Sequence, residues 1–111
     1  MKINMDYEID EDGNKFWYKE GKLHREYGPA VECDNGDKSW YKEGKIHRED
    51  GPAVECDNGN KYWYKEGKCH RIDGPAVEFV DGYKLYYYLG KQIECNSNEE
   101  YFKLLKLKAF W

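Results

Sequence analysis

Apolar and polar positions along this chain repeat every 23 residues, and within each copy they alternate with the period of a strand. In the middle copy, residues 53–56 and 61–65 are two short runs rich in β-branched and aromatic residues, and residues 57–60 (Asp-Asn-Gly-Asn) separate them. Asn-Gly between two such runs is a strong hairpin signal, because both central residues of a type I′ turn take positive φ. Each copy is therefore predicted to form a β-hairpin.

The pairing within this hairpin depends on its loop. A two-residue loop at Asn58-Gly59 would place Val54 opposite Trp63. A bulge in the turn would shift this register by one residue, so both registers are open at this point.

A second turn follows at Glu66-Gly67, and residues 69–75 then lead to the next hairpin. Gly74-Pro75 interrupts regular pairing in this connector, since proline has no N–H to donate and restricts the residue before it. The predicted unit is thus a hairpin plus a connector, which is too small to bury its own aromatic rings, so the units must stack.

All glycines, prolines, histidines and arginines occupy equivalent positions in successive copies. Trp17, Trp40 and Trp63 keep the same step, and Tyr86 takes the fourth place. Residue types confined to such positions serve the repeat geometry, whereas an active site is normally one arrangement of residues and not three copies. The pattern therefore predicts a protein that is not an enzyme and that uses no cofactor.

Stacked units predict a mainly β fold over residues 1–96. We expect a single-layer, twisted antiparallel β-meander built from 23-residue hairpin repeats, with no point at which it closes into a barrel. The first unit begins irregularly and the last one loses His, Arg and Gly-Pro, as the terminal units of a repeat array do.

Residues 97–111 have a helical pattern instead, and residues 97–100 (Ser-Asn-Glu-Glu) form a capping box in front of an apolar run. We expect this one C-terminal helix to pack as a cap on the same domain. The alternative is an exposed helix that contacts a partner, and Phe110-Trp111 keeps this open.

The chain holds 18 Lys and Arg against 22 Asp and Glu, a net charge of −4. An acidic body repels phosphates, so we expect a protein partner with a basic surface and no direct nucleic-acid binding. No apolar run approaches the length that crosses a bilayer, and no signal-peptide pattern is present. These features predict a cytoplasmic protein without membrane contact.

The string GKIHREDGPAVECDNG (residues 44–59), with WYKEG in each copy, resembles the HREDGPA-type repeats of small bacterial and bacteriophage proteins. Such repeats are similar in style to MORN-type hairpin repeats. The resemblance covers residues 12–90 and departs from the pattern at Tyr27, Cys69 and Ile72. It implies a repeat β-sheet without catalytic residues, and phage proteins of this kind commonly bind host proteins, including immunity proteins.

The three histidines would form a row in stacked copies, which suggests a metal or small-ligand site as an alternative: His24, His47 and His70. The arginine after each histidine adds positive charge where a cation would bind. We therefore expect the His-Arg pairs to fix the connector, through hydrogen bonds to the Asp-Gly-Pro turn or to glutamates of the next strand, and we predict no metal.

The four cysteines have no CxxC spacing. Cys33 and Cys56 are equivalent, and Cys69 stands where other copies have Leu or Ile. We interpret them as small reduced hydrophobes, with Cys95 outside the repeat as the candidate for a reactive thiol.

Two rows of glutamates recur in the repeat: Glu32, Glu55 and Glu78, and Glu20, Glu43 and Glu66. They are expected to form a solvated face, with cross-strand pairs to lysines: Lys38, Lys61 and Lys84. A regular row of carboxylates could also imitate a phosphate backbone and occupy a basic nucleic-acid channel in a partner.

These observations favour a non-enzymatic protein-binding module that uses an acidic and aromatic sheet surface. A sharper hypothesis is a phage-type inhibitor, acting in the host cytoplasm, that blocks a host defence or nucleic-acid-handling protein. The candidate contact residues are Trp40, Tyr41, Glu43, Asp50, Trp63, Tyr64 and Glu66. The alternatives are a structural protein that assembles into homo-oligomers through open sheet edges, and a small-ligand or metal binder that uses the histidine row.

Overall fold

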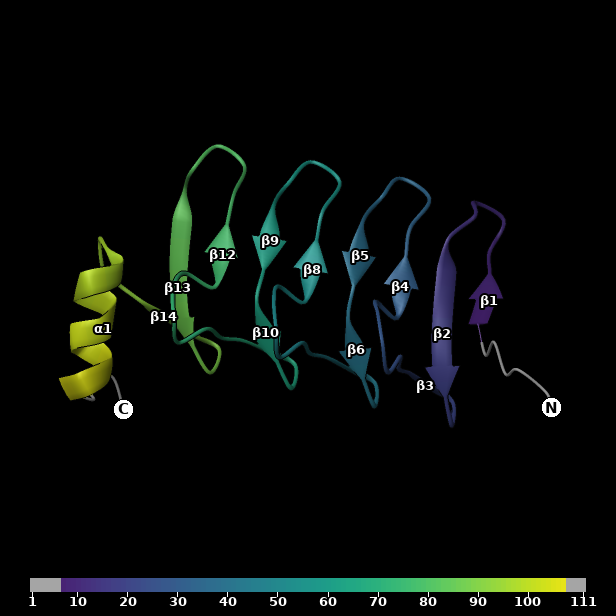
Figure 1. Cartoon of the computed structure of the whole chain (residues 1–111), viewed down its shortest axis with the longest axis horizontal. Coiled ribbons are helices and arrows are strands. Elements are labelled where there is room, and N and C mark those ends of the chain that lie inside the picture. The colour runs from purple at the N-terminus through teal and green to yellow at the C-terminus, as the bar shows by residue number, and fades with distance from the viewer. Residues whose placement is uncertain (1–6, 108–111) are drawn as a thin grey trace.

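The computed structural model describes residues 7–107 as an elongated, twisted β-meander with one helix packed at its C-terminal end (Figure 1). The molecule measures 52 × 29 × 19 Å along its principal axes. The predicted mainly β fold of antiparallel hairpin repeats, with no closure into a barrel, is confirmed.

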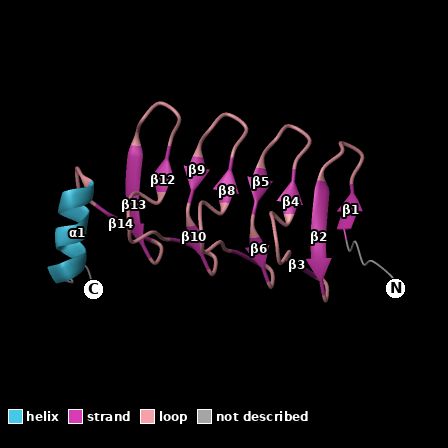
Figure 2. Ribbon diagram, in the orientation of Figure 1, coloured by secondary structure: helices cyan, strands magenta, loops and turns pink. Residues whose placement is uncertain are grey.

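Most strands within the described part of the chain are only two residues long (Figure 2). The elements are β1 (Tyr7–Ile9), β2 (Lys15–Lys19), β3 (Lys22–Leu23), β4 (Val31–Glu32), β5 (Lys38–Ser39), β6 (Tyr41–Lys42), β7 (Lys45–Ile46), β8 (Val54–Glu55), β9 (Lys61–Tyr62), β10 (Tyr64–Lys65), β11 (Lys68–Cys69), β12 (Val77–Glu78), β13 (Lys84–Tyr88), β14 (Lys91–Ile93) and α1 (Asn98–Leu107).

Each interior unit contains two hairpins at opposite edges of the sheet, and not one. In the orientation of Figure 1, β4–β5, β8–β9 and β12–β13 form upper hairpins, whereas β2–β3, β6–β7, β10–β11 and β13–β14 form lower hairpins. Neighbouring upper hairpins pair with each other, as β5 with β8 and β9 with β12, in a sheet of order β1-β2-β4-β5-β8-β9-β12-β13-β14. The expectation of one hairpin per unit was wrong, because residues 68–69 return along the strand that leads into the second turn.

The upper loops have three residues, so the register that pairs Val54 with Trp63 is wrong. Val54 lies opposite Tyr62, and Glu55 lies opposite Lys61. The Gly59 N–H donates to the Cys56 carbonyl at 2.9 Å, and Gly59 has a φ of 101°. This is a type I turn closed by a glycine bulge, the arrangement that shifts the register by one residue.

The lower turns are the two-residue type I′ turns, and three of them place a glutamate at positive φ. Glu66 and Gly67 have φ values of 49° and 84°, and Tyr64 pairs with Cys69 across the hairpin. Glutamate is disfavoured in this left-handed region because its Cβ crowds the following carbonyl oxygen. The same conformation occurs at Glu20, Glu43 and Leu89.

Backbone and side-chain hydrogen bonds join each unit to the next. The Trp40 N–H donates to the Ala53 carbonyl at 2.8 Å, which places Ala53 at the fully buried centre of the sheet. In the upper loops, a side-chain oxygen of Asp37 accepts from the Asp57 N–H at 2.6 Å. The equivalent contacts recur one repeat before and after, so the units stack by repeated polar contacts.

Helix α1 covers the C-terminal end of the sheet through Tyr101, which is fully buried against Tyr86 and Ile93. Ser97 caps the helix as predicted, since its Oγ accepts from the Glu100 N–H at 3.1 Å. The Glu100 carboxylate accepts from the Asn96 N–H at 2.6 Å, one residue before its place in a capping box. The described part of α1 is therefore a cap. The segment Phe110-Trp111, which kept a partner-binding helix open, lies outside the described residues.

Among residues 7–107, α1 has ten residues and is the one helix, and no helix there has the length and apolar character needed to cross a membrane.

Candidate functional site

The connectors, residues 24–30, 47–53 and 70–76, leave the sheet between a lower and an upper hairpin, and an arginine holds each in place. The Arg48 guanidinium lies 3.8 Å from the centre of the Trp40 ring, a cation–π contact. Its Nη1 donates to the Pro52 carbonyl and to Glu55, each at 3.0 Å. Arg25 and Arg71 make the same contacts, so the predicted role of the arginines in fixing the connector is confirmed.

The glycine before each proline leaves room for this arginine. A Cβ built on Gly51 would lie 3.1 Å from Cζ of Arg48, a tighter contact than most side chains make, so the arginine would have to shift slightly. The guanidinium is thus held between the tryptophan ring and the bare glycine backbone. From the sequence, this glycine was explained only by the interruption of strand pairing before proline. The structure adds a second reason, the close packing of the arginine against the glycine.

The histidines join one unit to the next, which differs from the expected bonds within the connector. Nδ1 of His47 accepts from the Glu66 N–H at 2.8 Å, so it satisfies a turn residue of the following repeat. His24 and His70 do the same for Glu43 and Leu89. A neutral imidazole that accepts through Nδ1 carries its proton on Nε2, and Nε2 of His47 lies 2.7 Å from the Glu49 carboxylate.

This use of the ring nitrogens weighs against the histidine row as a metal site, because Nδ1 of each ring is taken by a backbone N–H. No three His, Cys, Asp or Glu side chains within residues 7–107 are arranged to hold a metal ion.

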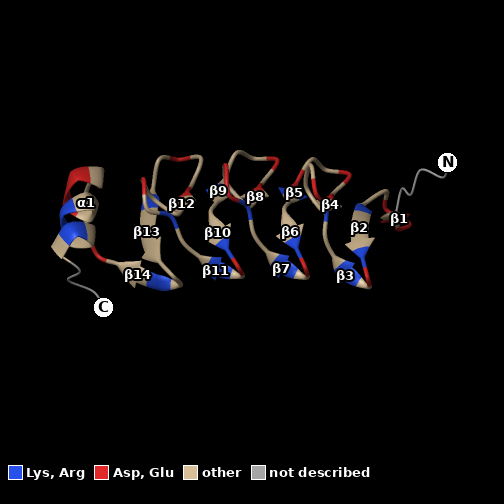
Figure 3. Cartoon of the chain, turned by 60° about the horizontal axis from the view of Figure 1, so that its bottom comes forward, with Lys and Arg blue, Asp and Glu red and all other residues tan. Residues whose placement is uncertain are grey.

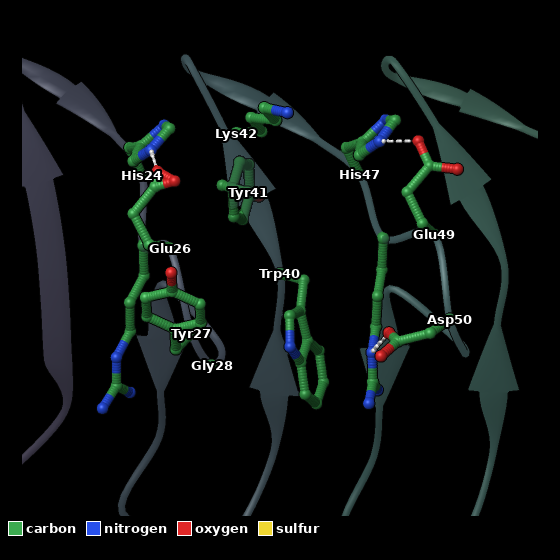
Figure 4. A pocket seen from close by; sticks show the side chains of 12 residues that line it. His24, Glu26, Tyr27, Gly28, Trp40, Tyr41, Lys42, His47, Glu49 and Asp50 are labelled. Atoms are coloured by element: carbon green, nitrogen blue, oxygen red, sulfur yellow. Dashed lines mark hydrogen bonds and ion pairs between the residues drawn. The ribbon is translucent and has the colours of Figure 1, made fainter.

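Two open grooves lie between successive connectors, and they are related by one repeat. The first connector groove, about 530 Å³, is lined by Trp40 and Tyr41 with Tyr27 and Asp50, among others (Figure 4). The second connector groove, about 560 Å³, is lined by Trp63 and Tyr64, again with Asp50. Five of the predicted contact residues therefore line one or both of these grooves: Trp40, Tyr41, Asp50, Trp63 and Tyr64.

The other two candidate contact residues, Glu43 and Glu66, do not line these grooves. They occupy the lower turns, where they line a first lower cleft of about 440 Å³ together with Lys22, Lys42 and Lys45. Lysines concentrate along this lower edge, whereas the upper loops and connectors carry most of the acidic side chains (Figure 3). The two-hairpin unit separates the charges in this way, because it puts the Lys-Glu-Gly-Lys turns at the edge opposite the upper loops.

The row of Glu32, Glu55 and Glu78 presents little free negative charge. Each carboxylate lies 3.0 Å from the arginine of its own connector. The expected lysines do lie directly opposite in the register, as Lys38 opposite Glu32, but the ion pairs found among the described residues are with arginine. The exposed acids of the connector grooves are instead connector residues, with the Asp50 side chain 86% exposed and that of Glu49 69% exposed.

Two exposed residues that were not among the predicted contacts are departures from the repeat. Tyr27, which stands where the other connectors have Asp, is 93% exposed in the first connector groove. Ile72 replaces the connector glutamate and is also exposed. Both were noted as deviations from the pattern, and an exposed apolar side chain at a position that is acidic elsewhere was the available signal.

The cysteines are free thiols in half-buried positions. Burial raises the pKa of the Cys69 thiol to about 11, and burial followed by nearby Glu100 and Glu94 raises the pKa of Cys95. A raised pKa lowers the thiolate fraction, so Cys95 is a poor nucleophile at neutral pH.

No protein-family model, no curated protein and no solved structure matches this chain.

Proposed function

We propose that this chain is a non-enzymatic protein-binding module that contacts a basic partner through its two connector grooves. The observation that carries the proposal is the recurrence of the same groove one repeat further along. Each groove combines a tryptophan and a tyrosine with exposed carboxylates.

The aromatic walls of the grooves are held rigid before any partner binds. Trp40 lies under Arg48 and Trp63 under Arg71, at 3.8 and 4.0 Å from ring centre to guanidinium carbon. Rigid aromatic side chains lose little conformational entropy on binding, which is why they are enriched at the energetic centres of interfaces. Tyr27 adds an exposed ring at the rim of the first connector groove.

The second connector, residues 47–53, carries two carboxylates for one arginine and lines both grooves, which favours a basic partner. Around Arg48 lie Glu49, Asp50 and Glu55. Because exposed ion pairs contribute only about 0.2–1 kcal/mol, Asp50 can accept a lysine or arginine of a partner at small cost to its own pair. Complementary charge of this kind speeds association and selects the partner.

A phage-type inhibitor that blocks a host defence or nucleic-acid-handling protein is the finer form of this proposal, with the host cytoplasm as its place of action. Two strands per repeat place equivalent carboxylates roughly 10 Å apart, whereas phosphates follow each other every ~3.4 Å along a strand of DNA. The acids therefore imitate only part of a phosphate backbone. Insertion of individual basic side chains into the grooves accounts better for the aromatic walls.

The test begins with a tagged pull-down from nuclease-treated lysate of the source host, washed at low and high salt and analysed by mass spectrometry. A captured protein is then purified, and its dissociation constant is measured with the wild type and with the double variant Glu49→Gln, Asp50→Asn. Both changes remove charge and keep hydrogen-bond acceptors. We expect binding about ten-fold weaker, with a smaller dependence on salt.

The matched control is the double variant Glu11→Gln, Asp12→Asn, which removes the same charge from an exposed loop outside the grooves. It should bind nearly as the wild type does. Equal weakening by both pairs, or binding that does not respond to salt, would contradict the proposal. Failure to capture any protein, together with a mass that rises with concentration, would favour self-assembly instead.

A further inference from the structure

The three histidines of the row differ in what their Nε2 meets. Nε2 of His24 and of His47 lies 3.0 and 2.7 Å from the carboxylate of a glutamate two residues later in the chain. Two residues after His70 stands Ile72, which has no carboxylate to offer. One repeat therefore has the same imidazole without the acceptor that the other two repeats supply.

The tautomer of His70 is fixed in the same way as in the other repeats. Its Nδ1 accepts from the Leu89 N–H at 2.8 Å, so the neutral ring carries its proton on Nε2 and presents a donor there. Burial, and then the charge of Lys65, lowers the pKa of His70, which favours this neutral form.

His70 lines two hollows: the second connector groove, with the acids Asp50 and Asp73, and a basic cleft at the lower edge. It lines a second lower cleft of about 440 Å³ together with Lys45, Lys65 and Lys68, and Glu66 is the carboxylate that lines this cleft. The equivalent first lower cleft also has three lysines, but three glutamates accompany them: Glu43, Glu49 and Glu66. Only the second lower cleft thus has a clear excess of positive charge.

Two substitutions relative to the repeat accompany this difference: Leu89, which lines the second lower cleft, and Ile72, which lines the second connector groove that shares His70 with it. Both expose apolar side chains. Ile72 stands at the position of Glu49 and Leu89 at the position of Glu66, and they are 59% and 50% exposed. Leu89 has a φ of 47°, a region that branched residues rarely adopt. The turn conformation is shared with Glu20, Glu43 and Glu66, so what distinguishes this repeat is the exposed apolar side chain and not the backbone.

We propose that the second lower cleft binds a carboxylate from an acidic peptide segment of a partner protein. The Nε2–H of His70 donates to this carboxylate, as the Nε2–H of His47 donates to Glu49 within the chain. The three lysines neutralise the peptide, and the exposed side chains of Ile72 and Leu89 contact an apolar residue beside the acid. This site lies on the lower edge of the sheet, and its residues Lys65, His70 and Ile72 also line the second connector groove. It takes an acidic ligand and not a basic one, so the two proposals can fail separately.

The His24–Glu26 and His47–Glu49 pairs favour a carboxylate as the ligand, because in both repeats the equivalent imidazole bonds to a glutamate carboxylate. The opposite charge of its ligand also makes the site testable apart from the connector grooves. The probe is an acetylated, amidated pentapeptide of alternating Glu and Leu, and the control is the same peptide with Gln for Glu. Binding is followed on isotope-labelled protein by NMR, at the Leu89 amide and the His70 ring.

We expect the acidic peptide to shift both signals, and the Gln peptide to bind at least about ten-fold more weakly, the effect of losing a charge-assisted hydrogen bond. Ile72→Glu supplies an internal carboxylate of the kind that two other repeats carry, so it should keep the fold and weaken peptide binding by about ten-fold or more. Lys65→Gln should weaken it also, while the distant Glu26→Ile should leave it unchanged.

Equal binding of the two peptides, no shift at His70, or full binding by Ile72→Glu would overturn the proposal. Binding of the wild type to vesicles of phosphatidylcholine and phosphatidylserine without binding to the peptide would also overturn it, and would indicate an anionic membrane surface instead. Melting curves of each variant show whether a loss of binding reflects a loss of fold.

Discussion

The interior repeats and the C-terminal end of the sheet are stabilised in different ways. Between interior repeats, the contacts are polar and recur with each unit, as with the His47 ring that accepts from the Glu66 N–H. At the C-terminal end, a cluster of buried residues forms instead, from Tyr86, Ile93 and Tyr101. A repeat array accumulates small equal contributions along its length, whereas its end needs a contact that no further repeat provides.

Tyr101 makes that contact. Its hydroxyl donates to the Arg71 carbonyl at 2.6 Å and lies 3.1 Å from the Tyr87 carbonyl. The Tyr87 carbonyl also accepts from the Arg71 N–H at 3.3 Å, as the Tyr64 carbonyl accepts from the Arg48 N–H within the array, so the phenol is an additional partner there. Burial raises the pKa of Tyr101 to about 12, so the phenol keeps its proton for this bond.

The largest effect is expected from removing the closure. Tyr101→Ala should lower the free energy of unfolding by about 3–5 kcal/mol, because it leaves a cavity beside Tyr86 and two carbonyls without the phenol. Urea denaturation measures this. Phe102→Ala, on the partly exposed face of the same helix, is the control and should cost about 1 kcal/mol or less. Equal losses in the two variants would mean that the cap adds no specific closure.

A smaller effect is expected inside the array. Arg48→Lys should destabilise by about 2 kcal/mol, since lysine cannot stack its planar group on Trp40 while bonding Pro52 and Glu55. Arg25→Lys should cost about 0.5 kcal/mol less, because position 27 is Tyr and the connector lacks the aspartate that pairs with Arg48. Thermal unfolding of both variants tests the comparison, and the reverse order would contradict it.

A stabilising change is expected at the lower turns. Glu66→Gly should raise the free energy of unfolding by about 0.5–1 kcal/mol, because glycine adopts positive φ without strain and the His47 bond to the backbone N–H is kept. Glu55→Gly, in strand β8 of the same sheet, should destabilise. A loss of stability in Glu66→Gly would mean that the glutamate side chain has a structural role.

The smallest effect is a dependence on pH. Burial and Lys65 lower the pKa of His70 in the folded state, so its contribution is complete above the unfolded value of about 6.5 and is lost as pH falls below that value towards the folded pKa. His70→Gln, which can still accept from the Leu89 N–H, should remove this part of the acid sensitivity. Urea midpoints measured across this pH range check it, and an unchanged slope would contradict it.

The fold could be predicted from the sequence because its information is repeated. The step of Trp17, Trp40 and Trp63 defines the unit, and Gly-Pro marks where pairing is interrupted. The register at Asn58-Gly59 stayed open because the same dipeptide fits a two-residue and a three-residue turn. The choice follows from a contact with the next repeat, where the Asn60 side chain accepts from the Val80 N–H at 2.8 Å. The sequence of a single repeat does not reveal a hydrogen bond to the next repeat.

The candidate site was predicted only in part for a similar reason. Residue type selected Trp40, Tyr41 and Asp50, which do line one groove. Glu43 was grouped with them because the second turn was treated as the end of a strand, whereas it is the tip of a second hairpin at the opposite edge. The spatial sorting of charge follows from this hairpin, and a count of charges along the chain cannot show it.

Because every interior unit bonds mainly to its immediate neighbours, a gene could gain or lose one 23-residue segment by unequal exchange without creating a new folding problem. Each added copy would lengthen the sheet by roughly 10 Å and add one more groove at the same spacing. The length of the sheet and the number of grooves can therefore change under selection in steps of one repeat. In each added copy, the histidine would accept from a backbone N–H of the following lower turn, as His47 does, and so keep the new repeat in register with its neighbour.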